Sequence, residues 1–297
     1  MGGSARGRPL GIVAGAGVMP VRLADAATKA GRPVACVLVE GFARAADYDR
    51  FPHQVIPLGQ IGRMVAMMRA HGARDLVLAG RISRPSLLSL RFDAEGMRLV
   101  AKLGRQALFG GDDGLLAAVL RVAREEGFEP VAIQDVLHGL LVEEGLLAGP
   151  APDALARADI RRGIGVAQAL GTADVGQCCV VQQGLVLGVE GIDGTDALLA
   201  RCAGLRREGP GGVLVKLVKP WQDRRVDLPA IGPDTVRNAA AAGLRGIAIE
   251  AVHDHAGTLV LERAETVAAA AAAGLFLLAV RPAVFMAGAE PAEGSEA

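Results

Sequence analysis

The chain has 297 residues, of which 51% are hydrophobic and only 3% aromatic, and its mean hydropathy is +0.34. This composition can fill one large core or two of ordinary size. The 32 basic and 32 acidic residues give a formal net charge of zero. Without a basic tail or a set of aromatic rings for base stacking, a nucleic-acid partner is not expected.

Neither a membrane span nor a secretion signal is expected. No run reaches the ~18 to 20 uninterrupted apolar residues that cross a bilayer. The first apolar run is broken by Gly15 and Gly17, which does not fit a signal peptide. The four cysteines form no C-x-x-C pair, which indicates buried, reduced thiols in a cytosolic protein. The small acidic tail over 287–297 is expected to be disordered.

The N-terminal half alternates short apolar runs with helical patterns. Such alternation predicts a parallel sheet covered on both faces by helices, here a Rossmann-like domain over 1–138. Strands are expected at 10–14, 34–39, 54–56, 76–79 and 131–133, and helices at about 20–30, 61–71, 97–109 and 115–127.

A linker is expected over 139–152, where the run GLLAGPAP combines Gly and Pro. The segment 153–286 is predicted to form a second α/β domain with a mixed sheet. Its strands are expected at 178–182, 185–189, 213–217, 247–249, 258–261 and 276–280, and its helices at about 153–170, 195–203, 233–242 and 265–273. The predicted fold is therefore α/β in two domains.

A glycine-rich run, GIVAGAGVMP, follows the first predicted strand and opens a helix. In that context backbone N–H groups and a helix N-terminus bind phosphate. Pro20 stands where the dinucleotide fingerprint has its third glycine, although Glu40 lies near the position of a ribose-binding acid. Two interpretations stay open, a nucleotide site and a tight β–α turn without a ligand. An NAD(P)-dependent oxidoreductase is the corresponding alternative function.

Two charged loops at predicted strand ends carry the main hypothesis. The first, EGIDGTD, spans 190–196, and the second spans 216–227 and contains two of the four lysines of the chain. Mg²⁺ takes one or two carboxylates together with substrate phosphate oxygens, and a lysine neutralises charge that develops at phosphorus. The two loops meet only if their strands are neighbours. Alternatively, Asp193 caps a helix and the other charges form surface ion pairs.

Other polar residues have simpler explanations. Asp112 and Asp113 precede a helix, so capping explains at least one of them. A solvated loop is expected for His253 to His255, because no third metal ligand lies nearby in the sequence. Asp174 and Gln177 precede a strand, and they are interpreted either as polar contacts or as parts of a turn.

Five motifs together resemble the LpxI family of UDP-2,3-diacylglucosamine pyrophosphatases of lipid A biosynthesis. The motifs are AGAGVMP at 14–20, GDDGLL at 111–116, DVGQ at 174–177, VEGIDGTD at 189–196 and KLVKPWQDRRVDLPAIG at 216–232. The resemblance implies hydrolysis of the substrate pyrophosphate to UMP and 2,3-diacylglucosamine 1-phosphate (lipid X). It also implies Mg²⁺ and two domains that hold the lipid between them.

The resemblance assigns roles to residues of both domains. The catalytic candidates are Asp227, Asp223, Lys216 and Lys219, and the metal candidates are Asp193, Asp196 and Asp227. The substrate-binding candidates are Gly15, Gly17, Met19, Gly80, Arg81, Asp112, Asp113, Gln177, Gly194, Thr195 and Gln222. A cytoplasmic homodimer in peripheral contact with the inner membrane is expected. A non-catalytic nucleotide or lipid carrier is the second alternative.

Overall fold

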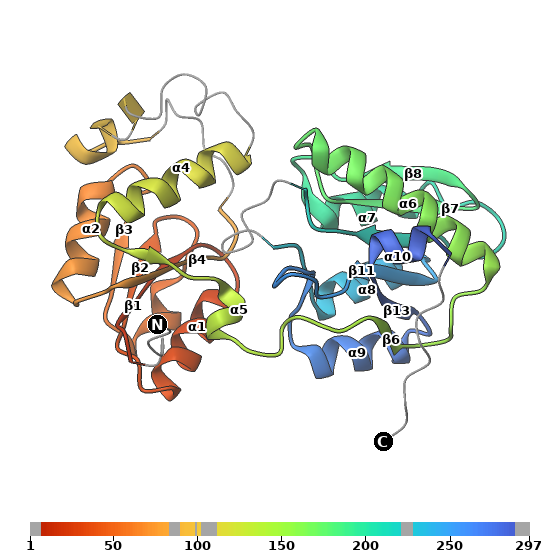
Figure 1. Cartoon of the computed structure of the whole chain (residues 1–297), viewed down its shortest axis with the longest axis horizontal. Coiled ribbons are helices and arrows are strands. Elements are labelled where there is room, and N and C mark those ends of the chain that lie inside the picture. Colours follow the sequence, from red (N-terminus) through yellow and green to blue (C-terminus); the bar gives the residue numbers. More distant parts are fainter. Residues whose placement is uncertain (1–6, 83–89, 99, 102–111, 221–227, 289–297) are drawn as a thin grey trace. The chain divides into compact units, whose positions relative to one another are not determined.

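The computed structural model describes residues 7–82, 90–98, 100–101, 112–220 and 228–288 (Figure 1). The chain divides into two compact units between His138 and Gly139. Each unit has its own β-sheet and its own helices, and both are of the predicted α/β class. No helix in the described ranges is both long and apolar enough to cross a membrane.

The first unit is built on a five-stranded parallel sheet in the order β3-β2-β1-β4-β5. The central position of β1 makes this a doubly wound sheet, and ligands of such sheets bind where the strand order reverses. The strands are β1 (Leu10–Ala14), β2 (Val34–Val39), β3 (His53–Ile56), β4 (Asp75–Ala79) and β5 (Glu129–Pro130). The helical elements are α1 (Met19–Lys29), η1 (Ala45–Tyr48), α2 (Ile61–Ala70), α4 (Asp112–Glu125) and α5 (Ile133–Val136).

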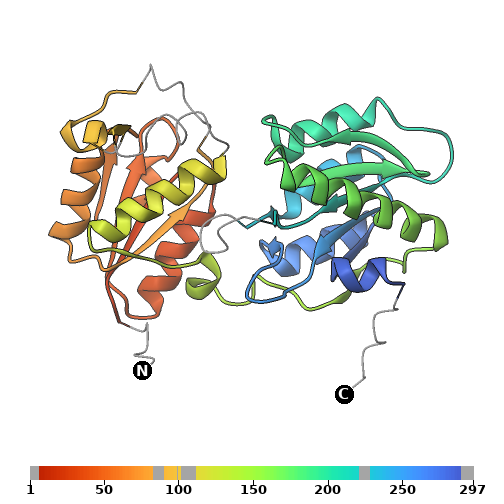
Figure 2. The same cartoon turned by 45° about the horizontal axis from the view of Figure 1, so that its top comes forward.

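Alternating side chains divide the first sheet into two buried faces. On one face Ala35, Val37 and Ile56 pack with the three methionines of α2 and with Ala123 of α4. Figure 2 shows α4, in yellow, lying across this sheet. The residues of opposite parity in β1 and β2, such as Ile12 and Cys36, are also fully buried, and α1 buries Leu23, Ala24 and Ala27 against these strands.

The second unit contains a mixed six-stranded sheet in the order β6-β13-β11-β9-β7-β8. Strands β13, β11 and β9 are parallel, whereas β6, β7 and β8 each pair antiparallel with a neighbour. The strands are β6 (Gly145–Ala148), β7 (Cys178–Gln182), β8 (Leu185–Val189), β9 (Val213–Lys216), β11 (Gly246–Glu250) and β13 (Phe276–Val280). A separate parallel pair consists of β10 (Ala230–Ile231) and β12 (Leu259–Val260).

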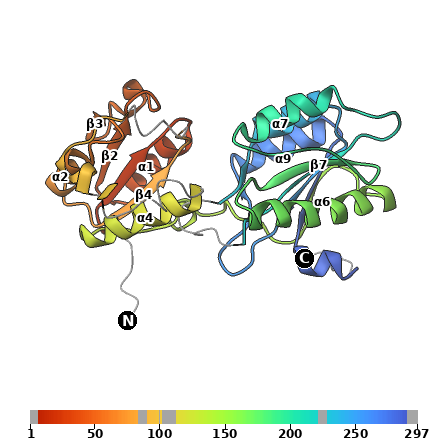
Figure 3. The ribbon, with the colours of Figure 1, turned by 90° about the horizontal axis from the view of Figure 1, so that it is seen from above.

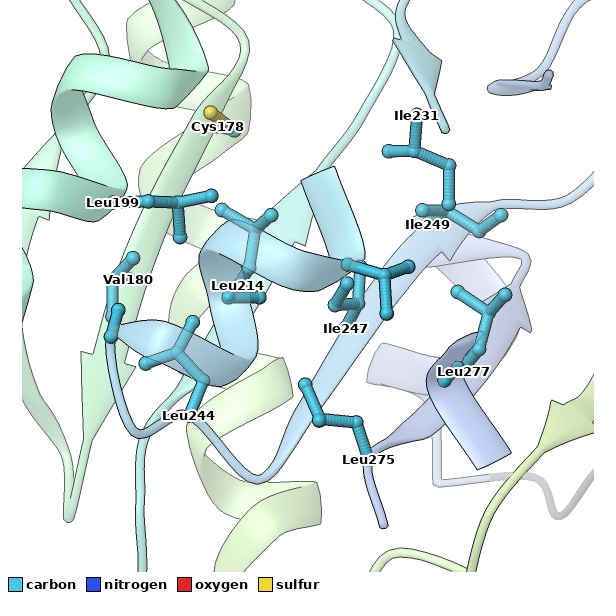
Figure 4. Packing of buried hydrophobic residues seen from close by; sticks show 14 of the residues in the cluster. Cys178, Val180, Leu199, Leu214, Ile231, Leu244, Ile247, Ile249, Leu275 and Leu277 are labelled. Carbon is cyan, nitrogen blue, oxygen red and sulfur yellow. The ribbon is translucent and has the colours of Figure 1, made fainter. Parts of the chain in front are cut away.

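Two apolar layers cover the faces of the second sheet. One layer joins the sheet to α6 (Ala154–Thr172) and α10 (Pro282–Met286). The other joins it to α7 (Gly194–Ala203), α8 (Pro233–Ala241) and α9 (Arg263–Ala272). Figure 3 shows α6 on one side of β7 and α7 and α9 on the other. In Figure 4 Leu214, Ile247 and Leu277, from three neighbouring strands, lie in the second layer.

The segment expected as a linker contains a strand. β6 lies within 139–152 and pairs antiparallel with β13 at the edge of the second sheet. Gly145 and Gly149, at the two ends of β6, are part of the Gly- and Pro-containing run from which the linker is predicted. Gly149 instead adopts a φ of +73°, and a side chain there would collide with the backbone of Leu275, so this glycine permits close packing.

Other boundaries also differ from the prediction. The strand expected at 131–133 is β5, at 129–130, and α5 begins at Ile133. The short strand β10 and the helix η1 were not predicted. Most of the helix expected at 97–109 lies outside the described residues, as do residues 289–297 of the expected disordered tail.

Candidate active site

Several strand ends of the second unit lie at one edge of its sheet. Strands β8, β9 and β11 end there at Val189, Lys216 and Glu250, and the antiparallel β7 begins there. Cys178 of β7 is opposite Lys216, and Cys179 is opposite Val189. The two predicted charged loops therefore follow strands that run in the same direction but are separated by β7.

The two loops meet although their strands are not neighbours. Lys216 Nζ donates a hydrogen bond of 2.8 Å to the hydroxyl oxygen of Thr195, the second residue of α7. Thr195 in turn donates a hydrogen bond of 2.6 Å to Glu190 Oε1. Lys216 lies on the same face of β9 as Leu214, which packs in the layer that contains α7. Thr195 of α7 therefore reaches Lys216 across β7. Glu190 and Lys216 are each only 6% exposed.

Gln177, just before β7, completes this hydrogen-bonded group. Its backbone N–H donates to the second carboxylate oxygen of Glu190 at 3.0 Å. Within the described part of the chain, its buried side-chain oxygen has no hydrogen-bond partner. An unsatisfied buried acceptor is costly, so a donor on a ligand or a water molecule is expected there.

Cys178 lies beside the same group but is not a suitable nucleophile. Its sulfur is 3.9 Å from Thr195 Oγ1. Burial raises the pKa of the Cys178 thiol far above its ordinary value, an effect that the nearby Lys216 only partly offsets. The thiol is therefore neutral at physiological pH, and a thiolate is required for attack.

The backbone that leaves β9 is held by β11 and the turn after it. Val218 N donates to a carboxylate oxygen of Glu250 at 2.9 Å, and Thr258 Oγ1 donates to the carbonyl oxygen of Lys216 at 3.2 Å. Sequence reasoning missed Glu250 and Thr258, which are single polar residues at the end of β11 and directly before β12. An acidic residue at the carboxyl end of a predicted strand was the one available signal for Glu250.

Lys219 has a different partner from Lys216. Its ammonium nitrogen lies 2.8 Å from Asp174 Oδ1, in the turn that follows α6. Asp174 adopts a positive φ of 51°, and the close approach of Lys219 and Pro220 to Gly171 fixes the same corner. Of the two expected catalytic lysines, Lys219 is paired with a carboxylate, whereas Lys216 bonds to a neutral hydroxyl.

The predicted metal ligands of the first loop have protein partners. Asp193 accepts from Gly191 N at 3.2 Å and forms an ion pair with Arg201, and it makes no side-chain capping bond although it precedes α7. Asp196 accepts from the side chain of Asn238 at 3.0 Å. Carboxylate oxygens are the donors that Mg²⁺ prefers, but a metal at Asp193 would have to compete with Arg201.

Three other predicted site residues, Gln222, Asp223 and Asp227, lie outside the described residues. Within the described ranges, no three His, Cys, Asp or Glu side chains are close enough to share a metal ion. The metal site and its dependence on Asp227 therefore stay predictions.

The first unit brings together several of its predicted substrate-binding residues. The loops after β1 and β4 are joined by a pair of backbone hydrogen bonds between Ala16 and Arg81, of 2.8 and 3.0 Å. A side chain at Gly15 would lie 2.6 Å from the carbonyl oxygen of Arg81, so this glycine is required for loop packing. Gly80 has a φ of +88°, and a side chain there would lie 2.8 Å from the carbonyl oxygen of Ala16.

This packing changes the interpretation of the glycine-rich run. The N–H groups of Gly15 and Ala16 are bonded to the carbonyl groups of Ala79 and Arg81, so these two amides are not available to a pyrophosphate. Gly17, with a φ of +103°, precedes α1, in which Met19 is buried. Asp112 and Asp113 begin α4. The tight-turn interpretation therefore accounts for Gly15.

The His253 to His255 segment is an exposed turn, as expected. His253 and Ala256 exchange backbone hydrogen bonds, and His253 Nε2 lies 3.2 Å from a carboxylate oxygen of Asp254. Asp254 and His255 both have positive φ, which such a tight turn requires.

Comparisons with known proteins cover both units. The family model of the LpxI N-terminal domain matches residues 9–140, and that of the LpxI C-terminal domain matches residues 143–278. The UDP-2,3-diacylglucosamine pyrophosphatase LpxI of Caulobacter vibrioides is 41% identical over 283 residues, which cover 93% of this chain and 98% of that protein. The resemblance carried by the five motifs is therefore confirmed.

Proposed function

Because the chain belongs to the LpxI family, we propose that it hydrolyses the pyrophosphate bond of UDP-2,3-diacylglucosamine in lipid A biosynthesis. The products are UMP and 2,3-diacylglucosamine 1-phosphate. The observation that carries the proposal is the 41% identity to a named UDP-2,3-diacylglucosamine pyrophosphatase over 93% of the chain. The geometry at the sheet edge of the second unit supports it.

Lys216 suits a substrate with a pyrophosphate group. Its ammonium group is buried, so its charge is less screened by water than that of a surface lysine. A preorganised cation of this kind stabilises negative charge that develops on the oxygens around an attacked phosphorus. The buried side-chain oxygen of Gln177, for which the described residues supply no donor, supports its assignment as a substrate contact.

Mg²⁺ is proposed as the cofactor. Asp193, Asp196 and Asp227 would hold the ion, and Arg201 would release Asp193 when the metal binds. The ion would act as a Lewis acid that polarises a phosphoryl oxygen. Asp227 or Asp223 would orient the attacking water molecule, and Lys216 and Lys219 would neutralise the charge of the phosphate oxygens.

The direct test is release of UMP from purified UDP-2,3-diacylglucosamine. The reaction is run with Mg²⁺ and with a chelator, and UMP is quantified by chromatography. The expected result is turnover with Mg²⁺ that disappears with chelator and returns when Mg²⁺ is restored. Full activity in chelator would overturn the metal assignment. Co-purification of the lipid without UMP release would instead support the non-catalytic carrier.

Location and assembly are part of the same proposal. The enzyme is proposed to be a cytoplasmic homodimer in peripheral contact with the inner membrane, because the acyl chains of its substrate reside in a bilayer. Co-sedimentation with anionic vesicles tests the contact, and light scattering coupled to gel filtration tests the dimer. Absence of vesicle binding would contradict the membrane contact, and a monomeric mass would contradict the homodimer.

A further inference from the structure

The hydrogen bonds between Lys216, Thr195 and Glu190 can run in only one direction. An ammonium group only donates, and an ionised carboxylate only accepts. The hydroxyl of Thr195 must therefore accept from Lys216 and donate to Glu190, at distances of 2.8 and 2.6 Å. One rotamer of this hydroxyl satisfies both partners, so the carboxylate sets the orientation of the group that holds the lysine.

Glu190 is itself held firmly. Its backbone N–H donates to the carbonyl oxygen of Cys178 at 2.9 Å, and its second carboxylate oxygen accepts from Gln177 N at 3.0 Å. A side chain at Gly176 would collide with the backbone of Glu190, so the chain before β7 packs tightly against it. Both the main chain and the side chain of Glu190 are thus fixed to the start of β7.

Charge balance around Lys216 also depends on Glu190. A buried ammonium group is costly unless an opposite charge lies nearby. On β7, the residue opposite Lys216 is Cys178, whose thiol is neutral. The nearby carboxylates are Glu190, which follows β8, and Glu250 at the end of β11, which accepts a hydrogen bond from Val218 N. Among the described residues, no carboxylate oxygen forms an ion pair with Lys216. Glu190 supplies its counter-charge through one hydroxyl.

This arrangement leaves donors on Lys216 for a ligand. An ammonium group has three N–H donors, and Thr195 Oγ1 is the acceptor found for Lys216 among the described residues. A carboxylate paired directly with an ammonium group, as Asp174 is with Lys219, would compete with an anionic substrate for that group. An intervening hydroxyl orients the ammonium group and keeps its charge available for a phosphate oxygen.

We propose that Glu190 and Thr195 form a positioning relay that aims Lys216 at a phosphate oxygen of the substrate. The inference rests on the proposed function and goes beyond it, because it makes Glu190 a positioning residue of the reaction. It also changes the expected role of Thr195 from a substrate contact to a group that acts through the lysine.

The test compares Thr195→Val, which removes the hydroxyl, with Thr195→Ser, which keeps it. Misplacement of Lys216 should lower kcat of Thr195→Val by about tenfold or more, with a smaller change in KM, while Thr195→Ser should stay within about threefold of the wild type. Thr172→Val is the matched control, because Thr172 bonds to Gln168 O on the exposed side of α6. Equal kcat values for the Val and Ser variants at position 195 would overturn the relay.

A double-mutant cycle separates a relay from a merely structural role. Glu190→Gln should lower kcat in the wild-type background and change it less than twofold in a Lys216→Met background, because a residue that acts through Lys216 has no effect without it. Additive losses in the two backgrounds would overturn the proposal. Urea unfolding of every variant shows whether the fold is intact.

Failure of the relay and failure of the proposed function give different results. An active wild type with equal Val and Ser variants at position 195 contradicts the relay alone. If the wild type releases no UMP, calorimetric binding of UMP makes the same comparison without turnover, with weaker binding expected for Thr195→Val than for Thr195→Ser. A wild type that neither turns over nor binds UMP would overturn both statements.

Discussion

Lys219 Nζ lies 2.8 Å from Asp174 Oδ1, and this ion pair connects the segment after β9 to the turn after α6. The side chain of Lys219 is 9% exposed and that of Asp174 is 29% exposed. The pair therefore lies at the border between interior and surface, and it holds the backbone that follows β9.

Asp174→Asn should destabilise the protein because it removes the negative charge that pairs with the ammonium group of Lys219, whose side chain is only 9% exposed. The expected loss is about 1–3 kcal/mol, less than for a fully buried pair since Asp174 is partly exposed. Asp234→Asn breaks the exposed pair with Arg237 and should cost about 0–0.5 kcal/mol. Urea unfolding at pH 7 measures both, and equal losses would contradict the structural importance of the Lys219 pair.

Asp227→Ala should lower turnover by about 10² or more, as expected for a group that holds a metal ion or orients the attacking water. The free energy of unfolding should change little. The assay is UMP release at saturating substrate and Mg²⁺, with Asp234→Ala as a control at an exposed position. Near-normal hydrolysis by Asp227→Ala would refute its assignment as a catalytic residue.

Apolar content and length decide which strands of the second unit could be predicted from the sequence. The buried strands β7, β9 and β13 were predicted to within one residue, because each consists mainly of consecutive apolar residues. The strands β6 and β10 were missed because they are short and bounded by Gly or Pro. Only pairing with distant segments makes them strands, and pairing is not visible in local patterns.

The site was also predicted only in part, because the contacts between its residues depend on pairing between distant strands. Lys216 and Thr195 were selected from charged loops, and the structure joins them by a hydrogen bond. Their meeting across β7 was not predictable, since strand order in a mixed sheet does not follow from chain order. The role of Glu190 depends on that geometry, and Glu250 and Thr258 lie in elements that carry no motif.

Arg201→Ala should lower the Mg²⁺ concentration needed for half-maximal activity, because the ion pair with Arg201 competes with a metal for Asp193. Arg201 also donates to Val189 O, so the free energy of unfolding must be measured in parallel. Arg237→Ala, which removes exposed ion pairs, is the control. An unchanged Mg²⁺ requirement would contradict Asp193 as a metal ligand.

The cysteine thiols should be unreactive in the folded protein. Burial raises the pKa of Cys36 and of Cys179 to about 12, and it raises the pKa of Cys178 further and that of Cys202 as well. A thiol with a raised pKa is protonated at pH 8 and reacts slowly with a disulfide reagent. All four should react after unfolding in guanidinium, and rapid labelling of a thiol in the native protein would contradict their burial.

Asp153 should make stability depend on acid pH. Its carboxylate accepts from Arg245 at 2.7 Å and from Ala156 N at 2.8 Å at the start of α6, and these bonds lower its pKa. A lowered pKa contributes stability that is present above the unfolded-state value of about 3.9 and is lost as the pH falls through the folded-state value.

Asp153→Asn removes this titration but keeps a side-chain oxygen that can cap α6. The variant should be less stable than the wild type at pH 7, because the ion pair with Arg245 is lost. The difference should shrink as the pH falls below the unfolded-state pKa of about 3.9 and the wild-type carboxylate becomes protonated. Urea midpoints from pH 7 to below this pKa measure the effect. A constant difference between the two proteins at every pH would show that the charge of Asp153 does not stabilise the fold.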